Sequence, residues 1–128
     1  MNDIRDKADI ERLVRLFYER ATKDAVIGHY FTTVVSINWE EHIPTIVSFW
    51  GNILFQTGEY KGGMLFKHMN LHFLDSFKPV HFERWLRIWE DTVDELFVGE
   101  KADEAKFRAN SIAVIMQNKL RVYPVAKK

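Results

Sequence analysis

The sequence predicts an all-α protein. Apolar residues recur at three- and four-residue intervals in each long segment, which is the period of one helix face. Residues that favour helix starts and glycines that favour helix ends flank these segments. The chain shows no internal repeat and no low-complexity stretch. We therefore expect one domain over residues 1–128, with a core of about 9–121 and a frayed C-terminal tail.

The first predicted helix runs from Asp9 to Lys23, with Asp9 as its N-cap. The next stretch is short and broken by Gly28, so we expect one helical turn that ends at Phe31. The apolar face of the first helix repeats at helical spacing. Its members are Ile10, Leu13, Val14, Phe17, Tyr18 and Ala21.

The second predicted helix starts near Asn38, which a glutamate follows three residues later in a capping-box pattern. We expect it to reach about Gln56 and to stop at Gly58. Pro44 lies beyond the first turn, where proline removes a backbone hydrogen bond and clashes with the preceding turn. Either the helix kinks near His42, or it begins later than the cap indicates.

Three further segments complete the helical pattern. After a loop over 58–63, one or two helical turns are expected over 64–70. Pro79 is placed to be the first residue of a long helix that ends at Gly99. A last helix is expected from about Asp103 to Arg121.

Composition excludes several classes of function. Eighteen basic and eighteen acidic residues cancel, and no basic stripe is visible, so we expect no nucleic-acid partner. Without cysteine, disulfide and thiolate–metal chemistry are ruled out. The polar start lacks the apolar core of a signal peptide, and no apolar run approaches the roughly 20 residues that span a bilayer. We expect a soluble cytoplasmic protein without membrane contact.

Four ring side chains stand at spacings that suit one buried iron site: Tyr18, His42, His68 and Trp85. His68 is the best ligand candidate, because it follows a flexible diglycine and neutral imidazole is the usual protein ligand of haem iron. Each residue also has an ordinary structural interpretation. The histidines could hydrogen-bond locally, the phenol could bond to the backbone, and the indole could simply pack.

The order of several short blocks is more specific than any one of them. The blocks are Leu16-Phe17-Tyr18-Glu19-Arg20, Gly28-His29-Tyr30-Phe31, Trp39-Glu40-Glu41-His42 with Phe49-Trp50, Tyr60-Lys61-Gly62 leading to His68, and Phe82-Glu83-Arg84-Trp85-Leu86. Together they resemble a truncated haemoglobin of the third group, found in bacteria, over about residues 9–120. The resemblance implies a truncated globin fold, a two-over-two helical sandwich around haem b.

The resemblance also implies residue roles. His68 would be the proximal iron ligand, Tyr18 the tyrosine facing bound gas, His42 the distal histidine, and Trp85 a tryptophan lining the distal pocket. Two features depart from the family pattern. Pro44 bears on whether His42 reaches the ligand, and the diglycine before His68 loosens the proximal segment.

The implied function is reversible binding of dioxygen and other diatomic gases. Hydrogen-bond donors on Tyr18 and Trp85 would favour tight oxygen binding. Phe31 would pack on the haem, and Ile46, one turn after His42, would form an apolar wall beside the iron. Peroxidase-like or nitric oxide dioxygenase activity is left open. Such turnover would need electrons from a separate reductase, because the sequence carries no flavin motif.

Two other interpretations are open at this point. His68 and His72 are four residues apart, so on one helix face they could bind zinc, with Asp75 as the nearest carboxylate. Alternatively, the aromatic residues could form the core of a helical interaction module without a cofactor. Metal analysis and the colour of the pure protein distinguish these interpretations from a haem protein.

Overall fold

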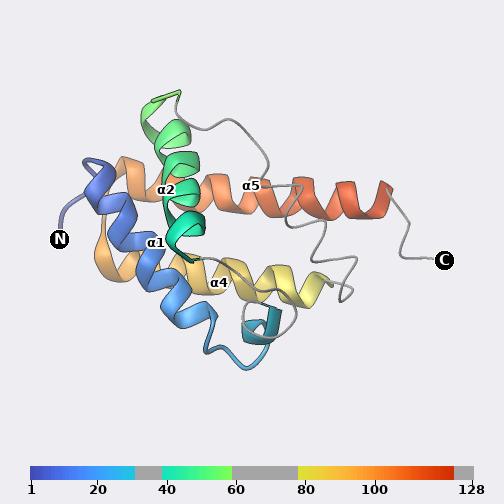
Figure 1. Cartoon of the computed structure of the whole chain (residues 1–128). Coiled ribbons are helices and arrows are strands. Elements are labelled where there is room, and N and C mark those ends of the chain that lie inside the picture. The colour runs from blue at the N-terminus through green and yellow to red at the C-terminus, as the bar shows by residue number, and fades with distance from the viewer. Residues whose placement is uncertain (31–38, 59–77, 123–128) are drawn as a thin grey trace.

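The computed structural model describes residues 1–30, 39–58 and 78–122, with side chains up to Asn118. These ranges contain four long helices, α1 (Lys7–Ala21), α2 (Trp39–Phe55), α4 (Pro79–Leu96) and α5 (Glu100–Val122), and no strand (Figure 1). Among the described residues, no helix is both long and apolar enough to span a membrane.

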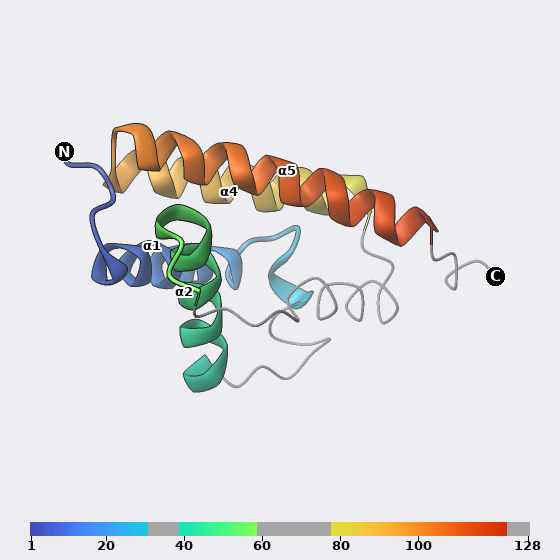
Figure 2. The same ribbon diagram turned by 90° about the horizontal axis from the view of Figure 1, so that it is seen from above.

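The helices form two layers. Figure 2 shows α4 and α5 side by side in one layer, with α1 and α2 in the other. Helix α1 packs on α2 and α4, while α2 also reaches α5. Within the second layer α2 crosses α1 steeply (Figure 1). This crossing brings side chains from two distant parts of the sequence together.

The centre of the core is a pair of stacked indoles between the layers. The rings of Trp50 on α2 and Trp89 on α4 lie 4.6 Å apart and nearly parallel. The Trp89 Nε1–H donates to the Ala105 carbonyl of α5 at 3.1 Å, which satisfies its polar atom inside the core. Small residues on the inner face of α5 permit this close approach. They are Ala102, Ala105, Ala109 and Ala113, all essentially inaccessible.

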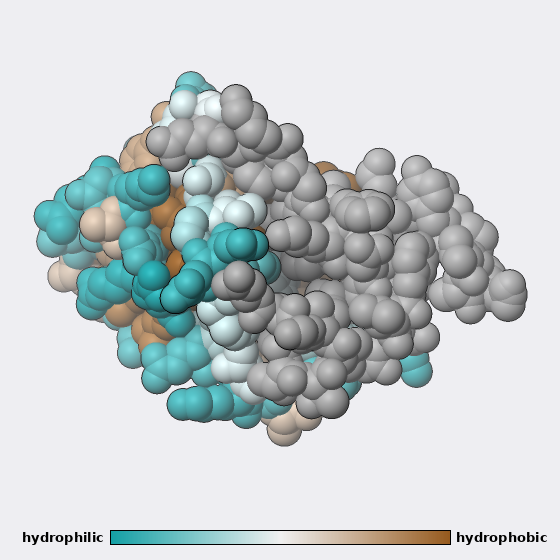
Figure 3. Space-filling model, in the orientation of Figure 1, coloured by the Kyte–Doolittle hydropathy of each residue, from teal (hydrophilic) through white to brown (hydrophobic). Residues whose placement is uncertain are grey.

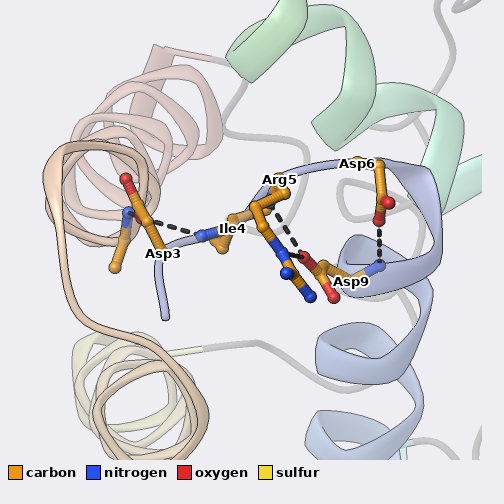
Figure 4. Close-up of polar contacts among 6 residues, drawn as sticks. Asp3, Ile4, Arg5, Asp6 and Asp9 are labelled. Atoms are coloured by element: carbon orange, nitrogen blue, oxygen red, sulfur yellow. Dashed lines mark hydrogen bonds and ion pairs between the residues drawn. The ribbon is translucent and has the colours of Figure 1, made fainter. Parts of the chain in front are cut away.

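Helix α1 begins two residues earlier than predicted, and its N-cap is Asp6 rather than Asp9. The Asp6 carboxylate accepts a hydrogen bond from the Asp9 backbone N–H at 3.0 Å. Asp9 instead accepts from the Arg5 backbone N–H at 2.9 Å (Figure 4). Both carboxylates accept from backbone N–H groups near the start of α1. The predicted residue type, aspartate, is therefore correct, but the capping residue is Asp6 and not Asp9.

Helix α2 begins at Trp39, as the capping pattern predicts, and Pro44 lies inside it with an exposed side chain. The later start considered for this helix is therefore wrong. The helix ends at Phe55, because Gln56 takes a left-handed φ of 56°. Gly58 also has a positive φ, of 75°, and its N–H donates to the Asn52 side chain at 2.8 Å.

The corner between α4 and α5 also differs from the prediction. Helix α4 starts at Pro79 as expected, but it ends at Leu96 rather than Gly99. Helix α5 starts at Glu100, three residues before the predicted Asp103. Gly99 has a φ of 142°, a conformation that favours glycine, so it serves the tight turn into α5 rather than the end of α4.

The early start of α5 depends on a cap supplied from the other end of the chain. The Asp3 carboxylate accepts from the backbone N–H groups of Lys101 at 2.9 Å and Ala102 at 2.8 Å. The Val98 N–H donates to the Asn2 carbonyl at 3.0 Å. A Cβ atom on Gly99 would stand 2.5 Å from the Asp3 side chain. The N-terminal segment therefore fastens the α4–α5 corner.

We expect Asp3→Ala to lower the free energy of unfolding by about 1–2 kcal/mol, which is the usual cost of losing a helix cap. Burial alone would raise the Asp3 pKa, but the N–H groups of Lys101, Ala102 and Ile4 outweigh it and hold the pKa below its ordinary value. A carboxyl with a lowered folded-state pKa stabilises above its unfolded pKa and loses this effect as pH falls through the folded value.

Urea unfolding followed by circular dichroism measures this effect at pH 7 and below pH 4. The difference between wild type and Asp3→Ala should be full at neutral pH and should shrink in acid. Asp91→Ala, on the exposed surface of α4, serves as the control and should unfold like the wild type. Equal midpoints for the wild type and Asp3→Ala at pH 7 would show that the cap contributes nothing.

Candidate functional site

A hydrogen bond joins two of the predicted site residues where α1 crosses α2. The Tyr18 hydroxyl and the His42 Nε2 atom are 3.0 Å apart. Tyr18 belongs to the buried face of α1, and His42 belongs to the first turn of α2. Their rings meet edge to face at 5.1 Å. Pro44 therefore does not carry His42 away from Tyr18.

Burial controls the protonation of this tyrosine. Only 7% of the Tyr18 surface is exposed, and desolvation raises the pKa of its phenol well above the ordinary value. The hydroxyl therefore keeps its proton at neutral pH. When the neutral imidazole of His42 carries its proton on Nδ1, Tyr18 donates to the free Nε2 atom.

Trp39 is a third member of this cluster, and it was not among the site residues predicted from the sequence. Its ring lies 5.2 Å from that of Tyr18 and 5.6 Å from that of His42. Trp39 and His42 are three residues apart, so they share one side of α2. That spacing is the signal that could have identified Trp39 from the sequence.

Trp85 reaches the same region from α4, in the other layer. It is buried, and its ring meets Phe17 edge to face at 6.2 Å. Phe17 in turn meets the Tyr18 ring at 4.9 Å. Ile46, one turn after His42, is also buried. Tyr18 and His42 are thus in direct contact, and Trp85 is linked to Tyr18 through the Phe17 ring. Ile46 belongs to the same buried core.

Two predicted positions cannot be placed. His68 and Phe31 lie outside the described residues, as do His72 and Asp75 of the zinc interpretation. Their roles stay predictions. In the part of the chain that is described, no three histidine or acidic side chains converge as they would around a metal ion.

Ion pairs hold α1 and the turn after it against α4. The Asp24 carboxylate accepts from the Arg84 guanidinium at 3.0 Å and from the backbone N–H groups of Val26 and Ile27. Burial alone would raise the Asp24 pKa, but these donors outweigh it and lower the pKa. Arg20 near the end of α1 pairs with Glu95 of α4. These contacts fix Tyr18 on α1 relative to Trp85, the neighbour of Arg84.

Comparisons with known proteins agree in sequence and in structure. No family model matches the chain. The group 3 truncated hemoglobin ctb of Campylobacter jejuni is 31% identical over 121 residues, which cover 92% of this chain and 93% of that protein. The crystal structure of a group III truncated hemoglobin from the same species matches with a TM-score of 0.80 at 31% identity, over 94% of this chain and 95% of that one.

Proposed function

The chain belongs to the group III truncated haemoglobins, and from this premise we propose that it binds dioxygen and other diatomic gases reversibly at a haem b held by His68. Membership of the family implies the haem. The identity of His68 as its ligand, and the roles of the residues around the gas, are parts of the proposal.

The observation that carries the proposal is the hydrogen bond between Tyr18 and His42. The buried phenol of Tyr18 faces the half-buried imidazole of His42, beside the rings of Phe17 and Trp39. A hydroxyl and an imidazole can donate hydrogen bonds to a bound gas, so this pair fits the gas-binding side of a haem. Haem, when bound, supplies an iron atom with one open coordination position and draws negative charge onto dioxygen.

Tyr18 would act as the hydrogen-bond donor to dioxygen. Because burial keeps its phenol protonated, it offers a permanent O–H group at neutral pH. A hydrogen bond to a charged group is worth about 1.5–3 kcal/mol, and 1.4 kcal/mol is a factor of ten in an equilibrium constant. His42, in the tautomer that carries its proton on Nε2, would donate to the Tyr18 oxygen and so leave the phenol proton for dioxygen. Trp85 would line the pocket from α4, and Ile46 would form its apolar wall.

The same pair of residues also supports peroxide chemistry as a second candidate function. An imidazole nitrogen can accept a proton and return it, which is the role of a general acid–base group, and Nε2 of His42 could act in this way. The Nε2 atom lies 3.0 Å from the Tyr18 hydroxyl, so a proton on this atom would be next to the proposed pocket. Turnover of peroxide or nitric oxide would take electrons from a separate reductase.

The ultraviolet–visible spectrum of haem-reconstituted ferrous protein tests the proposal. We expect the Soret band to shift on exposure to oxygen, and to shift to a different position with carbon monoxide, because an open coordination position admits both gases. Reduction and repeated exposure should restore each spectrum. A preparation that takes up no haem, or a Soret band that neither gas moves, would refute the proposed function.

A further inference from the structure

A groove of about 300 Å³ lies between α1 and the first residue of α2. Its lining is Arg15, Tyr18, Glu19, Thr22 and Trp39. Figure 3 views the face on which α1 and α2 lie in front of α4, and there small hydrophobic areas show between the hydrophilic side chains. The groove therefore combines a polar rim with ring surfaces from the two helices.

The groove shares one residue with the candidate gas-binding site. Tyr18 lines the groove, and the same residue bonds through its hydroxyl to His42. Trp39 also lines the groove and lies beside both rings. A molecule in the groove would contact Tyr18 and Trp39. It would stand one side chain away from the Tyr18–His42 hydrogen bond.

Trp39 is placed to move without disturbing the helix. It is the first residue of α2 and is only partly buried. The indole can turn about its own side-chain torsions, and this movement needs no shift of the backbone and breaks no backbone hydrogen bond of α2. Turning the indole away from Tyr18 would open space in the groove beside the Tyr18 ring.

The charges on the rim indicate the class of molecule that the groove admits. Arg15 and Glu19 are both exposed on the groove, so their charges oppose one another. Arg15 also pairs with Glu11 at 2.8 Å. One guanidinium and two carboxylates leave a single negative charge beside the groove, which is a weak field for drawing in ions. Small neutral molecules are therefore the class that the groove favours, because they can pack against its ring surfaces.

We propose that neutral diatomic gases reach the site through this groove, and that Trp39 sets the rate of their passage. This inference rests on the proposed function. A barrier on an entry route is crossed in both directions, so lowering it speeds association and dissociation by the same factor and leaves the affinity unchanged. A residue that stabilises the bound gas changes the dissociation rate and the affinity instead.

Two variants with opposite effects test the route by carbon monoxide association after flash photolysis and by its dissociation on replacement with nitric oxide. Trp39→Ala should raise the association and dissociation rates about two- to tenfold, because the barrier falls by the energy of the lost ring contact with Tyr18. Thr22→Trp fills the groove and should lower both. Ser111→Trp, in the other layer, is the matched control, since Ser111, like Thr22, donates its hydroxyl to a backbone carbonyl three or four residues earlier.

A second measurement is independent of gas binding. The Tyr18 hydroxyl proton, followed by nuclear magnetic resonance, should exchange with water faster in Trp39→Ala and more slowly in Thr22→Trp. Protein that binds carbon monoxide with wild-type rates in both variants would overturn the route and leave the proposed function standing. A change in affinity without matched rates would assign Trp39 to the pocket and overturn its role in passage. Protein that binds no gas at all would overturn both proposals.

Discussion

Dioxygen should dissociate about ten to a hundred times faster from Tyr18→Phe than from the wild type. The variant removes one hydroxyl, which is buried on α1 and protonated at neutral pH. A hydrogen bond to a negatively charged ligand contributes about 1.5–3 kcal/mol, and this loss appears in the dissociation rate. Stopped-flow mixing of the oxygenated protein with carbon monoxide measures that rate directly.

Carbon monoxide gives an internal comparison, because it attracts much less negative charge than dioxygen and gains less from a donor. Its dissociation rate should change far less than that of oxygen. Thr92→Val is the control variant. It removes another buried hydroxyl, which donates to the Ile88 carbonyl and accepts from Arg20, and because the Arg20–Glu95 ion pair is kept it should leave oxygen dissociation unchanged. An oxygen dissociation rate in Tyr18→Phe equal to that of the wild type would remove Tyr18 from the pocket.

The role of His42 follows from the same experiment extended to a double variant. If His42 acts by orienting the Tyr18 hydroxyl, the single variant His42→Leu should release oxygen faster than the wild type. Adding His42→Leu to Tyr18→Phe should then have little further effect on the dissociation rate. Residues in direct contact commonly couple in this way. Additive effects would instead mean that His42 contacts the gas independently of Tyr18.

The sequence predicted the all-α fold and its membership of the truncated haemoglobins, and both are confirmed. Helix periodicity found every described helix, because the buried faces of α1, α2, α4 and α5 recur at regular spacing. The errors lie at helix ends. The start of α5 was misplaced because its cap, Asp3, lies almost a hundred residues away in the sequence, and no local pattern can reveal a partner at that distance.

The site could be predicted only in part, again because contacts between residues that are distant in the sequence are not visible in it. Residue order and family resemblance indicated Tyr18, His42 and Trp85, but they could not show that Tyr18 and His42 hydrogen-bond to each other. That contact depends on the angle at which α2 crosses α1. Trp39 was not predicted for the same reason, because its place in the cluster depends on contact with the Tyr18 ring on another helix. Pro44 drew attention as a disturbance, yet α2 continues through it.

The largest effect that we expect belongs to His68→Gly. If His68 is the proximal ligand, its removal takes away the bond between the protein and the iron. Loss of a residue that merely supports a metal ligand already costs about 10- to 100-fold in affinity, so loss of the ligand itself should exceed a hundredfold. The Soret band of the reconstituted protein should disappear or weaken strongly. Added imidazole should restore it by filling the space of the missing side chain.

His29→Gly is the matched control, since His29 is an exposed histidine on the turn after α1 and has no proposed role with haem. It should reconstitute like the wild type, with or without imidazole. Restoration by imidazole in His68→Gly alone separates a missing ligand from a misfolded chain, because a chain that fails to fold gains nothing from a free ring. A His68→Gly variant with the unchanged spectrum of a five-coordinate haem would rule out His68. The iron ligand would then have to be another side chain, while membership of the family would still stand.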